Sequence, residues 1–385
     1  MRNSFVHSKR KNALALNKSR KNKGDISILV LTLCLSFFGV VSVYSASSYT
    51  AKTQYGNAFY FAGKQLVGFL LGAVCMFVCA RLDVGRLKSK KVRVFAYLLA
   101  VILLALVFVP GLGKSNYGAT RWIAIGGVTV QPSEIAKYAF VLCSAGYISE
   151  HAGKMRTLTG VLPVLAMGGL VCLLIMLEPN MSVTMCVGVL MLATVFIGGA
   201  NTKTFLCIGI PALLAVPVLI LIEPYRLLRL SAFLDPWASP KEEGYQLIQS
   251  LYALGNGGWF GTGLFNSRQK YRFLPFAESD FVLAIIGEEL GFIGVLCLFS
   301  TSLFLIYRGF SVAARAEDLH SCMLAVGITL VYGVQTLLNA LVVSGSIPPT
   351  GLPLPLVSAG NTSLIVTMAS MGVLYAVSRG HKERK

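Results

Sequence analysis

Hydrophobic residues gather in long runs along this chain, and short polar segments separate the runs. A helix needs about 20 apolar residues to cross a bilayer, and windows of that length find ten such runs. The runs lie near residues 26–46, 60–80, 94–112, 133–149, 160–178, 182–200, 204–222, 281–307, 320–342 and 361–378. The pattern predicts an all-α, polytopic membrane protein with about ten transmembrane helices.

The composition excludes an ordinary soluble protein. Of the 385 residues, 55% are hydrophobic and 13% are charged, against about 25% charged residues in soluble domains. The net charge of +18 would suggest nucleic acid in a soluble protein, but here the cations cluster outside the runs: eight lie in 1–25, six in 81–93 and four in 379–385. This distribution fits the positive-inside rule, so both termini are predicted to be cytoplasmic and no nucleic acid is expected as a partner.

The chain divides into one ten-helix membrane domain, 26–378, between two basic cytoplasmic tails, 1–25 and 379–385. The N-terminal tail is expected to rest on anionic membrane lipid, with an interaction arm as the alternative. The long non-membrane stretch, 223–279, separates the seventh and eighth runs and is expected to be a large extracytoplasmic loop. Function is most often carried by such loops.

This loop contains a glycine-rich segment followed by cations. Five of the nine residues in 255–263 are glycine, and Arg268, Lys270 and Arg272 come next. Glycine lets the backbone approach a ligand closely, and cations suit an anionic group such as pyrophosphate. A re-entrant loop with cations anchored at the membrane interface is the alternative.

Asp280 lies where the loop enters the eighth helix. Together with Ala284, Gly287, Glu288 and Gly291 it is spaced to form one helix face, which is expected to look into the bundle or a wet cavity. Helix capping is the alternative role for Asp280.

The four histidines, His7, His151, His320 and His381, are all expected near cytoplasmic ends. Acid and base chemistry on the outer side must therefore use a carboxylate, and Asp280 is the best placed.

Two further groups of polar residues are expected on the same side. Ser133 is a candidate N-cap of the fourth helix, where Glu134 and Lys137 share a face and either pair or line a hydrated pocket. Gln335 and Asn339 share a face of the ninth helix, where they either join helices or serve a site. A stiff proline-rich segment, 348–355, follows.

Six separated motifs in this order resemble the SEDS family (shape, elongation, division and sporulation). They are RWI at 121–123, QPSEIAK at 131–137, FLDPW at 233–237, GYQLIQS at 244–250, SDF at 279–281 with GEELG at 287–291, and PPTGLPLP at 348–355. Within the family, residues 235–237, residues 266–270 and the basic N-terminal tail resemble the division branch, FtsW, more than RodA.

The resemblance implies a peptidoglycan glycosyltransferase that polymerises lipid II at the outer face of the bacterial cytoplasmic (inner) membrane, at the division septum. It implies a class B penicillin-binding protein and other division proteins as partners. Asp280 would be the base on the acceptor GlcNAc 4-hydroxyl, and undecaprenyl pyrophosphate would leave. The substrate-binding residues would be Arg121, Gln131, Ser133, Glu134, Lys137, Gln249, Arg268, Lys270 and Arg272. No cofactor is required and no metal-ligand cluster is expected, although a divalent cation, Mg²⁺ or Mn²⁺, can assist.

The chain departs from the family pattern at three positions. Phe276 and Glu278 stand where relatives usually carry Glu and His, and Asn180 stands where they carry Asp. Two other functions stay open, a lipid II flippase and a scaffold for the penicillin-binding protein. A transferase needs a base at Asp280, whereas a flippase has no evident need for one.

Overall fold

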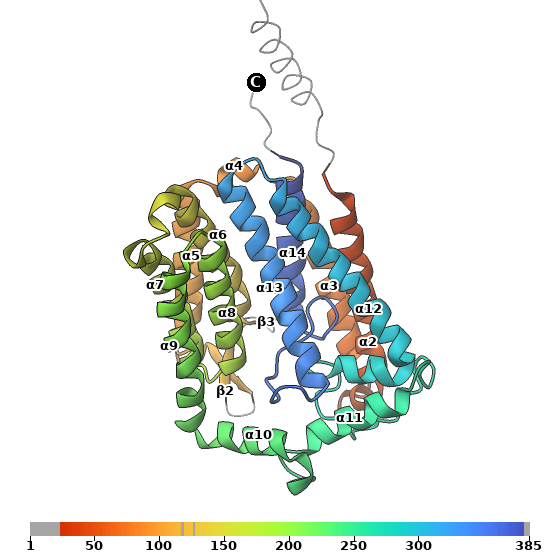
Figure 1. Ribbon diagram of the computed structural model, residues 1–385. Coiled ribbons are helices and arrows are strands. Elements are labelled where there is room, and N and C mark those ends of the chain that lie inside the picture. Colours follow the sequence, from red (N-terminus) through yellow and green to blue (C-terminus); the bar gives the residue numbers. More distant parts are fainter. Residues whose placement is uncertain (1–23, 117–118, 126–127, 381–385) are drawn as a thin grey trace, which may run out of the picture.

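Ten long helices form the body of the protein in the computed structural model (Figure 1), which describes residues 24–116, 119–125 and 128–380. They are α2 (Ile26–Tyr55), α3 (Tyr60–Ala80), α5 (Lys90–Leu106), α6 (Pro132–Glu150), α7 (Leu158–Leu177), α8 (Met181–Ile197), α9 (Thr202–Leu221), α12 (Val282–Ala314), α13 (Leu319–Val343) and α14 (Asn361–Ser378). Each predicted run matches one of them. Seven, namely α2, α3, α7, α9, α12, α13 and α14, are long and apolar enough to span a membrane. The all-α, polytopic class is thus confirmed.

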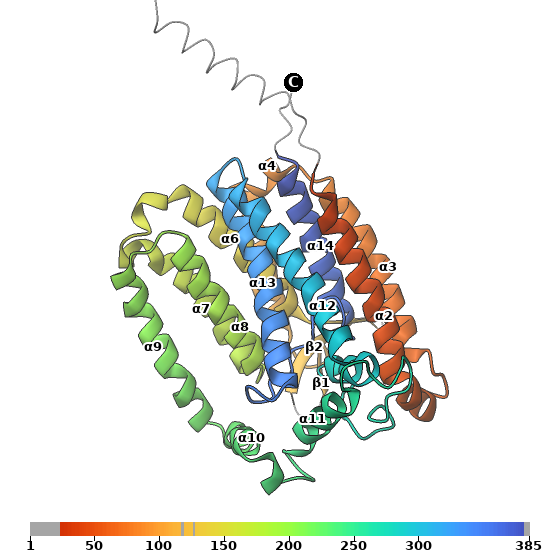
Figure 2. The same cartoon turned by 45° about the vertical axis from the view of Figure 1, so that its right-hand side comes forward.

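The two ends of the described chain lie together at one end of the bundle (Figure 2), where the Asp25 amide donates to Ser378 Oγ at 2.8 Å. We call this the terminal end; α4 (Val84–Leu87) and the short helix η1 (Ala152–Lys154) also belong to it. The expected basic tails fall mainly in 1–23 and 381–385, outside the described residues.

The opposite end, called the loop end, carries most of the non-membrane chain. The predicted loop at 223–279 contains α10 (Pro224–Leu234), a short helix η2 (Pro236–Ala238) and α11 (Tyr245–Gly257). A small antiparallel sheet also lies here, with strands β1 (Gly113–Asn116), β2 (Ala119–Ile125) and β3 (Val128–Val130) in that order. The sheet was not predicted, although β-branched and aromatic residues in β2 and β3 favour strands.

Helix α6 begins directly after the sheet. Pro132 occupies its first helical position, and Gln131 is the N-cap residue. The prediction that Ser133 caps this helix is wrong, because proline at the first position moves the boundary one residue earlier. Ser133 lies inside the helix, where it is fully buried.

Two hydrophobic clusters hold the bundle together. The larger contains Phe281, Tyr332 and Met368 and joins mainly α2, α6, α12, α13 and α14. The smaller joins α5, α6, α7 and α8 to Leu352. Helix α9 lies at the edge of the bundle (Figure 2), and Thr204 is its one buried residue within the described chain. Helix α6 and the segment around Leu352 are therefore fixed from several sides.

Helix α12 is broken at Gly291, whose φ of 66° and ψ of −169° are not helical. A break frees backbone groups that a continuous helix would pair. The glycine-rich segment pairs them: Thr262 N donates to Glu288 O (2.9 Å), Gly263 N to Glu289 O (3.0 Å), Phe292 N to Gly258 O (2.9 Å) and Ile293 N to Trp259 O (3.1 Å). The expected face is confirmed in its burial, since Ala284, Gly287, Glu288 and Gly291 are all buried, but the prediction of one regular helix from Asp280 to Gly291 is wrong. Asp280 precedes the first helical residue, Val282, and the helix does not continue regularly past Gly291.

Candidate functional site

Asp280 lies in the turn before α12 at the loop end, and it is partly exposed. Asn339 Nδ2, on α13, donates to the Asp280 carbonyl oxygen at 2.9 Å and to the Leu352 carbonyl oxygen at 2.7 Å. A Cβ atom on Gly351 would lie only 3.3 Å from Asp280 Oδ2, and the φ of Gly351 is +72°. One amide thus fastens the Asp280 turn to the proline-rich segment, and glycine lets the two approach closely.

The proline-rich segment, 348–355, is where several helices meet. Its carbonyl oxygens accept hydrogen bonds from three other elements. Gln335 Nε2 on α13 donates to Pro353 O at 3.1 Å, Arg229 Nη1 on α10 donates to Pro349 O at 3.2 Å, and Ser182 Oγ on α8 donates to Thr350 O. Because proline cannot continue a helix, this stretch leaves its carbonyls available to these donors. The segment therefore gathers α8, α10 and α13 around Asp280.

A buried ion pair on α6 is connected to the same segment. Lys137 Nζ lies 2.8 Å from Glu134 Oε1 and 2.6 Å from Gln335 Oε1. The Lys137 side chain is 0% exposed and that of Glu134 is 2% exposed. The predicted pairing of these two residues is confirmed. Through Gln335, the pair also sets the position of the segment.

Arg121, on β2, ties the sheet to the end of α7. Its Nε donates to the Glu178 carbonyl oxygen at 3.3 Å, and its Nη2 donates to the Pro179 carbonyl oxygen. The Asn180 side chain caps α8 by accepting from the Val183 amide, a role that aspartate fills equally well.

The electrostatic surroundings of Asp280 suit a base. Burial raises its pKa to about 6, while a hydrogen bond from Ser279 and the positive charges of Arg229 and Arg121 act in the lowering direction. A carboxylate with this pKa is ionised at neutral pH and accepts a proton more readily than an ordinary aspartate.

The other predicted site residues lie in different surroundings. The Gln131 backbone N–H donates to Thr362 Oγ1 at 3.2 Å, and Gln249 lies half-buried on α11. Lys270 Nζ lies 3.5 Å from Glu289 Oε1 and also donates to Phe265 O. The remaining loop cations contact other neighbours: Arg272 Nη2 donates to Thr53 Oγ1 at 2.9 Å, and the Arg268 backbone amide donates to Glu288 at 3.2 Å. These contacts group the 268–272 cations with α2 and α12, whereas Arg121 and Arg229 influence Asp280.

Glu288 and Glu289 act as buried anchors for the loop that carries these cations. Glu288 accepts hydrogen bonds from the Ser267 hydroxyl and the Gln269 amide, and Glu289 accepts from the Ser267 amide at 3.1 Å. The sequence singled out both acids but gave no signal of these partners. It also did not single out Arg229 or Thr350, whose contacts are made only once α8 and α10 meet the proline-rich segment.

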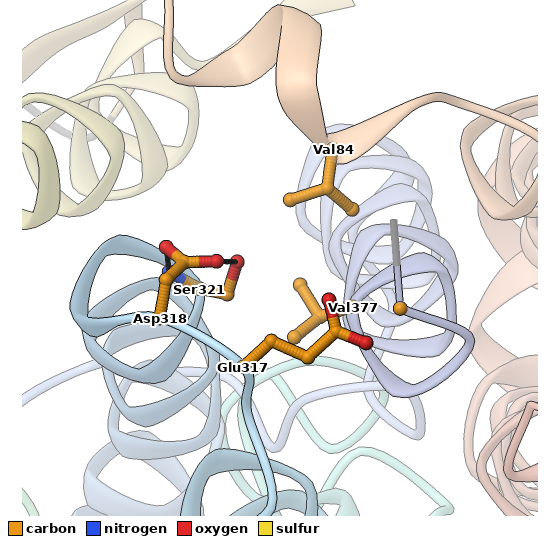
Figure 3. Close-up of a pocket in the computed structure, with 6 residues that line it drawn as sticks. Val84, Glu317, Asp318, Ser321 and Val377 are labelled. Atoms are coloured by element: carbon orange, nitrogen blue, oxygen red, sulfur yellow. Dashed lines mark hydrogen bonds between the residues drawn. The ribbon is translucent and has the colours of Figure 1, made fainter. Parts of the chain in front are cut away.

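A second polar cluster lies at the terminal end (Figure 3). Asp318 caps α13 by accepting from the Ser321 amide at 3.0 Å and pairs with Lys88 at 2.9 Å. Burial alone would raise the pKa of Asp318, but the hydrogen bonds from Lys88 and Ser321 lower it to about 2. Glu317 and Asp318 border a cavity of about 10 Å³, which has room for roughly one water. This cluster closes the end of the bundle opposite Asp280.

Metal ligands are not gathered in the described parts of the chain: no three His, Cys, Asp or Glu side chains there are grouped so as to hold an ion.

The fold and the site together define a polytopic membrane protein with a carboxylate and two arginines gathered at one end of the bundle. The chain belongs to the FtsW, RodA and SpoVE family of cell cycle proteins, whose family model matches residues 26–383. The family assignment made from the six motifs is thus confirmed.

Two curated relatives align along almost their whole length. A probable peptidoglycan glycosyltransferase FtsW from Geobacter sp. (strain M18) is 38% identical over 355 residues, which cover 92% of this chain and 96% of that protein. Stage V sporulation protein E of Bacillus subtilis (strain 168) is 38% identical over 368 residues, covering 94% of this chain and 98% of that protein.

Solved structures share the fold. A chain from work on the structural coordination of polymerization and crosslinking by a peptidoglycan synthase complex superposes with a TM-score of 0.76 at 29% identity, over 93% of this chain and 98% of that chain. The rod shape determining protein RodA of Thermus thermophilus gives a TM-score of 0.69 at 25% identity, over 93% and 97%.

Proposed function

We propose that this protein is a peptidoglycan glycosyltransferase that polymerises lipid II into glycan strands. The loop end faces outward from the bacterial cytoplasmic membrane, and the product is septal cell wall made during division. The observation that carries the proposal is the placement of Asp280, which lies against Gly351 and within the electrostatic influence of Arg121 and Arg229. The names of the FtsW relatives support the activity, and the motifs at 235–237 and 266–270 support the division role.

The chemistry follows from these groups. Asp280 takes the proton of the acceptor GlcNAc 4-hydroxyl, and the resulting oxygen attacks the anomeric carbon of the donor sugar. The bond from that carbon to the pyrophosphate oxygen breaks, and undecaprenyl pyrophosphate leaves with the electron pair. A sugar carbon of this kind passes through a transition state with oxocarbenium character. Arg121 and Arg229 stabilise the negative charge that grows on the leaving phosphate.

The buried ion pair of α6 positions the proline-rich segment beside Asp280. Lys137 is fully buried between Glu134 and Gln335, and Gln335 in turn holds the Pro353 carbonyl. Lys137 thus positions the proline-rich segment and supplies positive charge beneath it. A divalent cation that assists the reaction would be held mainly by the substrate pyrophosphate, as Mg²⁺ commonly is, with one or two carboxylates from the protein.

The proposed partner is a class B penicillin-binding protein that cross-links the strands, together with other division proteins. The match to a chain from a peptidoglycan synthase complex supports this partner, because that work concerns polymerization and crosslinking in one assembly.

The test is polymerisation of labelled lipid II by the purified protein with its class B partner. Wild type is expected to make glycan strands, and Asp280→Asn is expected to lose them while keeping its thermal stability. Glu242→Gln, in the exposed part of the loop, is the matched control and should retain activity. If wild type makes no strands but moves lipid II across liposome membranes, the protein is a flippase. If it does neither yet binds and activates the partner, it is a scaffold.

A further inference from the structure

Glu178 is a buried acid at the end of α7, and its side chain is unsatisfied within the part of the chain that the structure describes. It is 0% exposed, and neither of its carboxyl oxygens has a hydrogen-bond partner among the described residues. Buried polar groups in native proteins almost always have partners, and in membrane proteins an unsatisfied acid marks a functional position by default. A group that is left without a protein partner is available for a ligand.

The side chain emerges on the inner face of α7. Val171 and Ile175 precede Glu178 by seven and three residues, which places all three on one helix face. Val171 and Ile175 pack in the cluster that also contains Val183 of α8 and Leu352 of the proline-rich segment. Glu178 is therefore the last residue of this helix face, and it lies near the place where the proline-rich segment packs against α8.

Arg121 lies beside Glu178 but does not hydrogen-bond its carboxylate. The guanidinium donates to the carbonyl oxygens of Glu178 and Pro179, and its charge acts on both Glu178 and Asp280. Glu178 and Asp280 thus lie in the surroundings of one guanidinium. Burial raises the pKa of Glu178 to about 8 even though Arg121 opposes the shift, so the carboxyl is uncharged at neutral pH and does not need a counter-ion.

Three other buried oxygen atoms, on elements near the loop end, also lack a hydrogen-bond partner among the described residues. They are Glu134 Oε2 on α6, Asn339 Oδ1 on α13 and Thr350 Oγ1 on the proline-rich segment. The uncharged Glu178 carboxyl and the Thr350 hydroxyl can each donate one hydrogen bond and accept others, whereas Glu134 Oε2 and Asn339 Oδ1 only accept, so a ligand that satisfies the whole set must bring donors. Sugar hydroxyls and acetamido N–H groups are such donors, whereas phosphate oxygens are not and suit the arginines instead.

We propose that the Glu178 carboxyl is a further substrate-binding group, which hydrogen-bonds a hydroxyl or acetamido group of a sugar held beside Arg121. This inference rests on the proposed function, because it takes an amino sugar as the ligand. Glu178 then belongs to the part of the site that grips the sugar, while Arg121 and Arg229 face the pyrophosphate.

The test compares Glu178→Gln and Glu178→Leu in the full protein with its class B partner, using fluorescent lipid II as the probe. Glutamine keeps the size and the hydrogen bonds, so its KM should stay close to that of wild type. Leucine removes the hydrogen bonds, so its KM should rise about five- to tenfold with a smaller change in kcat. The thermal stability of Glu178→Leu should equal or exceed that of wild type, because an unsatisfied buried carboxylate has been removed. Glu242→Leu, an exposed acid in the loop, is the matched control and should change neither quantity.

A structural role for Glu178 would give the opposite result. If Glu178→Leu lowers stability and activity together, or if its KM equals that of wild type, the inference is overturned. If the leucine variant does not fold, Glu178→Met carries the same comparison, and failure of both to fold also overturns it. Absence of glycan strands from wild type would overturn the proposed function, whereas active wild type with an unaffected leucine variant overturns the role of Glu178 alone.

Discussion

Ser45 on α2 donates a hydrogen bond to Glu289 on α12, with Ser45 Oγ 2.6 and 2.8 Å from the two carboxylate oxygens. Glu289 also pairs with Lys270 at 3.5 Å, and both side chains are nearly fully buried. One acid therefore joins α2, α12 and the loop at 265–272. The short stretch of α12 that follows Asp280 is held at its far end by this contact and by the glycine-rich segment.

Glu289→Leu should destabilise the protein strongly, because it leaves the Lys270 ammonium buried without its carboxylate. Breaking a buried pair in this way costs about 3–5 kcal/mol. Thermal unfolding in detergent measures the loss, and limited proteolysis shows whether the loop opens. The double variant Glu289→Leu/Lys270→Met should recover most of the stability, since no unpaired charge remains. Equal instability of the single and double variants would instead mean that Ser45 and the Ser267 amide are the important partners.

Gly291→Ala should also be damaging, for a different reason. The φ of +66° disfavours any residue with a Cβ, and a Cβ there would lie 2.4 Å from the Gly261 amide nitrogen. We expect a loss of more than about 2 kcal/mol together with reduced polymerisation, because the broken helix can no longer pair with the glycine-rich segment. Gly188→Ala on α8 is the control: its Cβ would meet nothing within 4 Å, so this variant should be neutral or slightly stabilising. A Gly291→Ala variant as stable and active as Gly188→Ala would contradict the pairing as a constraint on α12.

The long helices and the break in α12 differ in how far the sequence predicts them. Every long helix was predictable, because a membrane requires an apolar run for each span. The break at Gly291 was not, because its cause is the pairing with residues 258–263, which the hydrophobic pattern does not record. Arg229 was missed for a similar reason, since its partner Pro349 is 120 residues away in sequence. Asp280 was found because exclusion of histidine left a carboxylate as the outer base, and the family motif pointed to the same residue.

Lys137→Met tests whether the α6 pair serves stability or activity. Removing the ammonium leaves Glu134 buried without its partner, so stability should fall by about 3–5 kcal/mol. The double variant Glu134→Leu/Lys137→Met removes both charges and should restore thermal stability. Its polymerisation should stay low, because Gln335 loses the Lys137 contact through which the proline-rich segment is positioned. Recovery of both stability and activity in the double variant would show that the pair has only a structural role.

The rate of polymerisation should depend on pH through Asp280. Because its pKa is about 6, the carboxylate is mostly ionised at pH 7 and can accept a proton from the sugar hydroxyl. As pH falls through 6 the carboxyl becomes protonated and can no longer act as a base, so kcat should fall about tenfold for each further pH unit. The measurement is the initial rate of glycan strand formation between pH 5 and 8, with the class B partner present and the lipid II concentration saturating.

A control must separate titration of Asp280 from acid unfolding. The Asp318 carboxyl has a pKa lowered to about 2 in the folded protein, so the stability it contributes is present above the unfolded pKa of about 4 and is lost only as pH falls below that value. Asp318 therefore contributes the same stability at pH 5 as at pH 7. The raised folded-state pKa values of Glu178 and Asp280 make the folded protein bind more protons than the unfolded chain in this range, so thermal stability should rise as pH falls from 7 to 5 while the rate falls. Asp280→Glu, which keeps a titrating carboxyl, should retain an acid limb in any remaining activity, whereas residual activity of Asp280→Asn should lack it. A wild-type rate that does not change between pH 5 and 7 would remove Asp280 as the base.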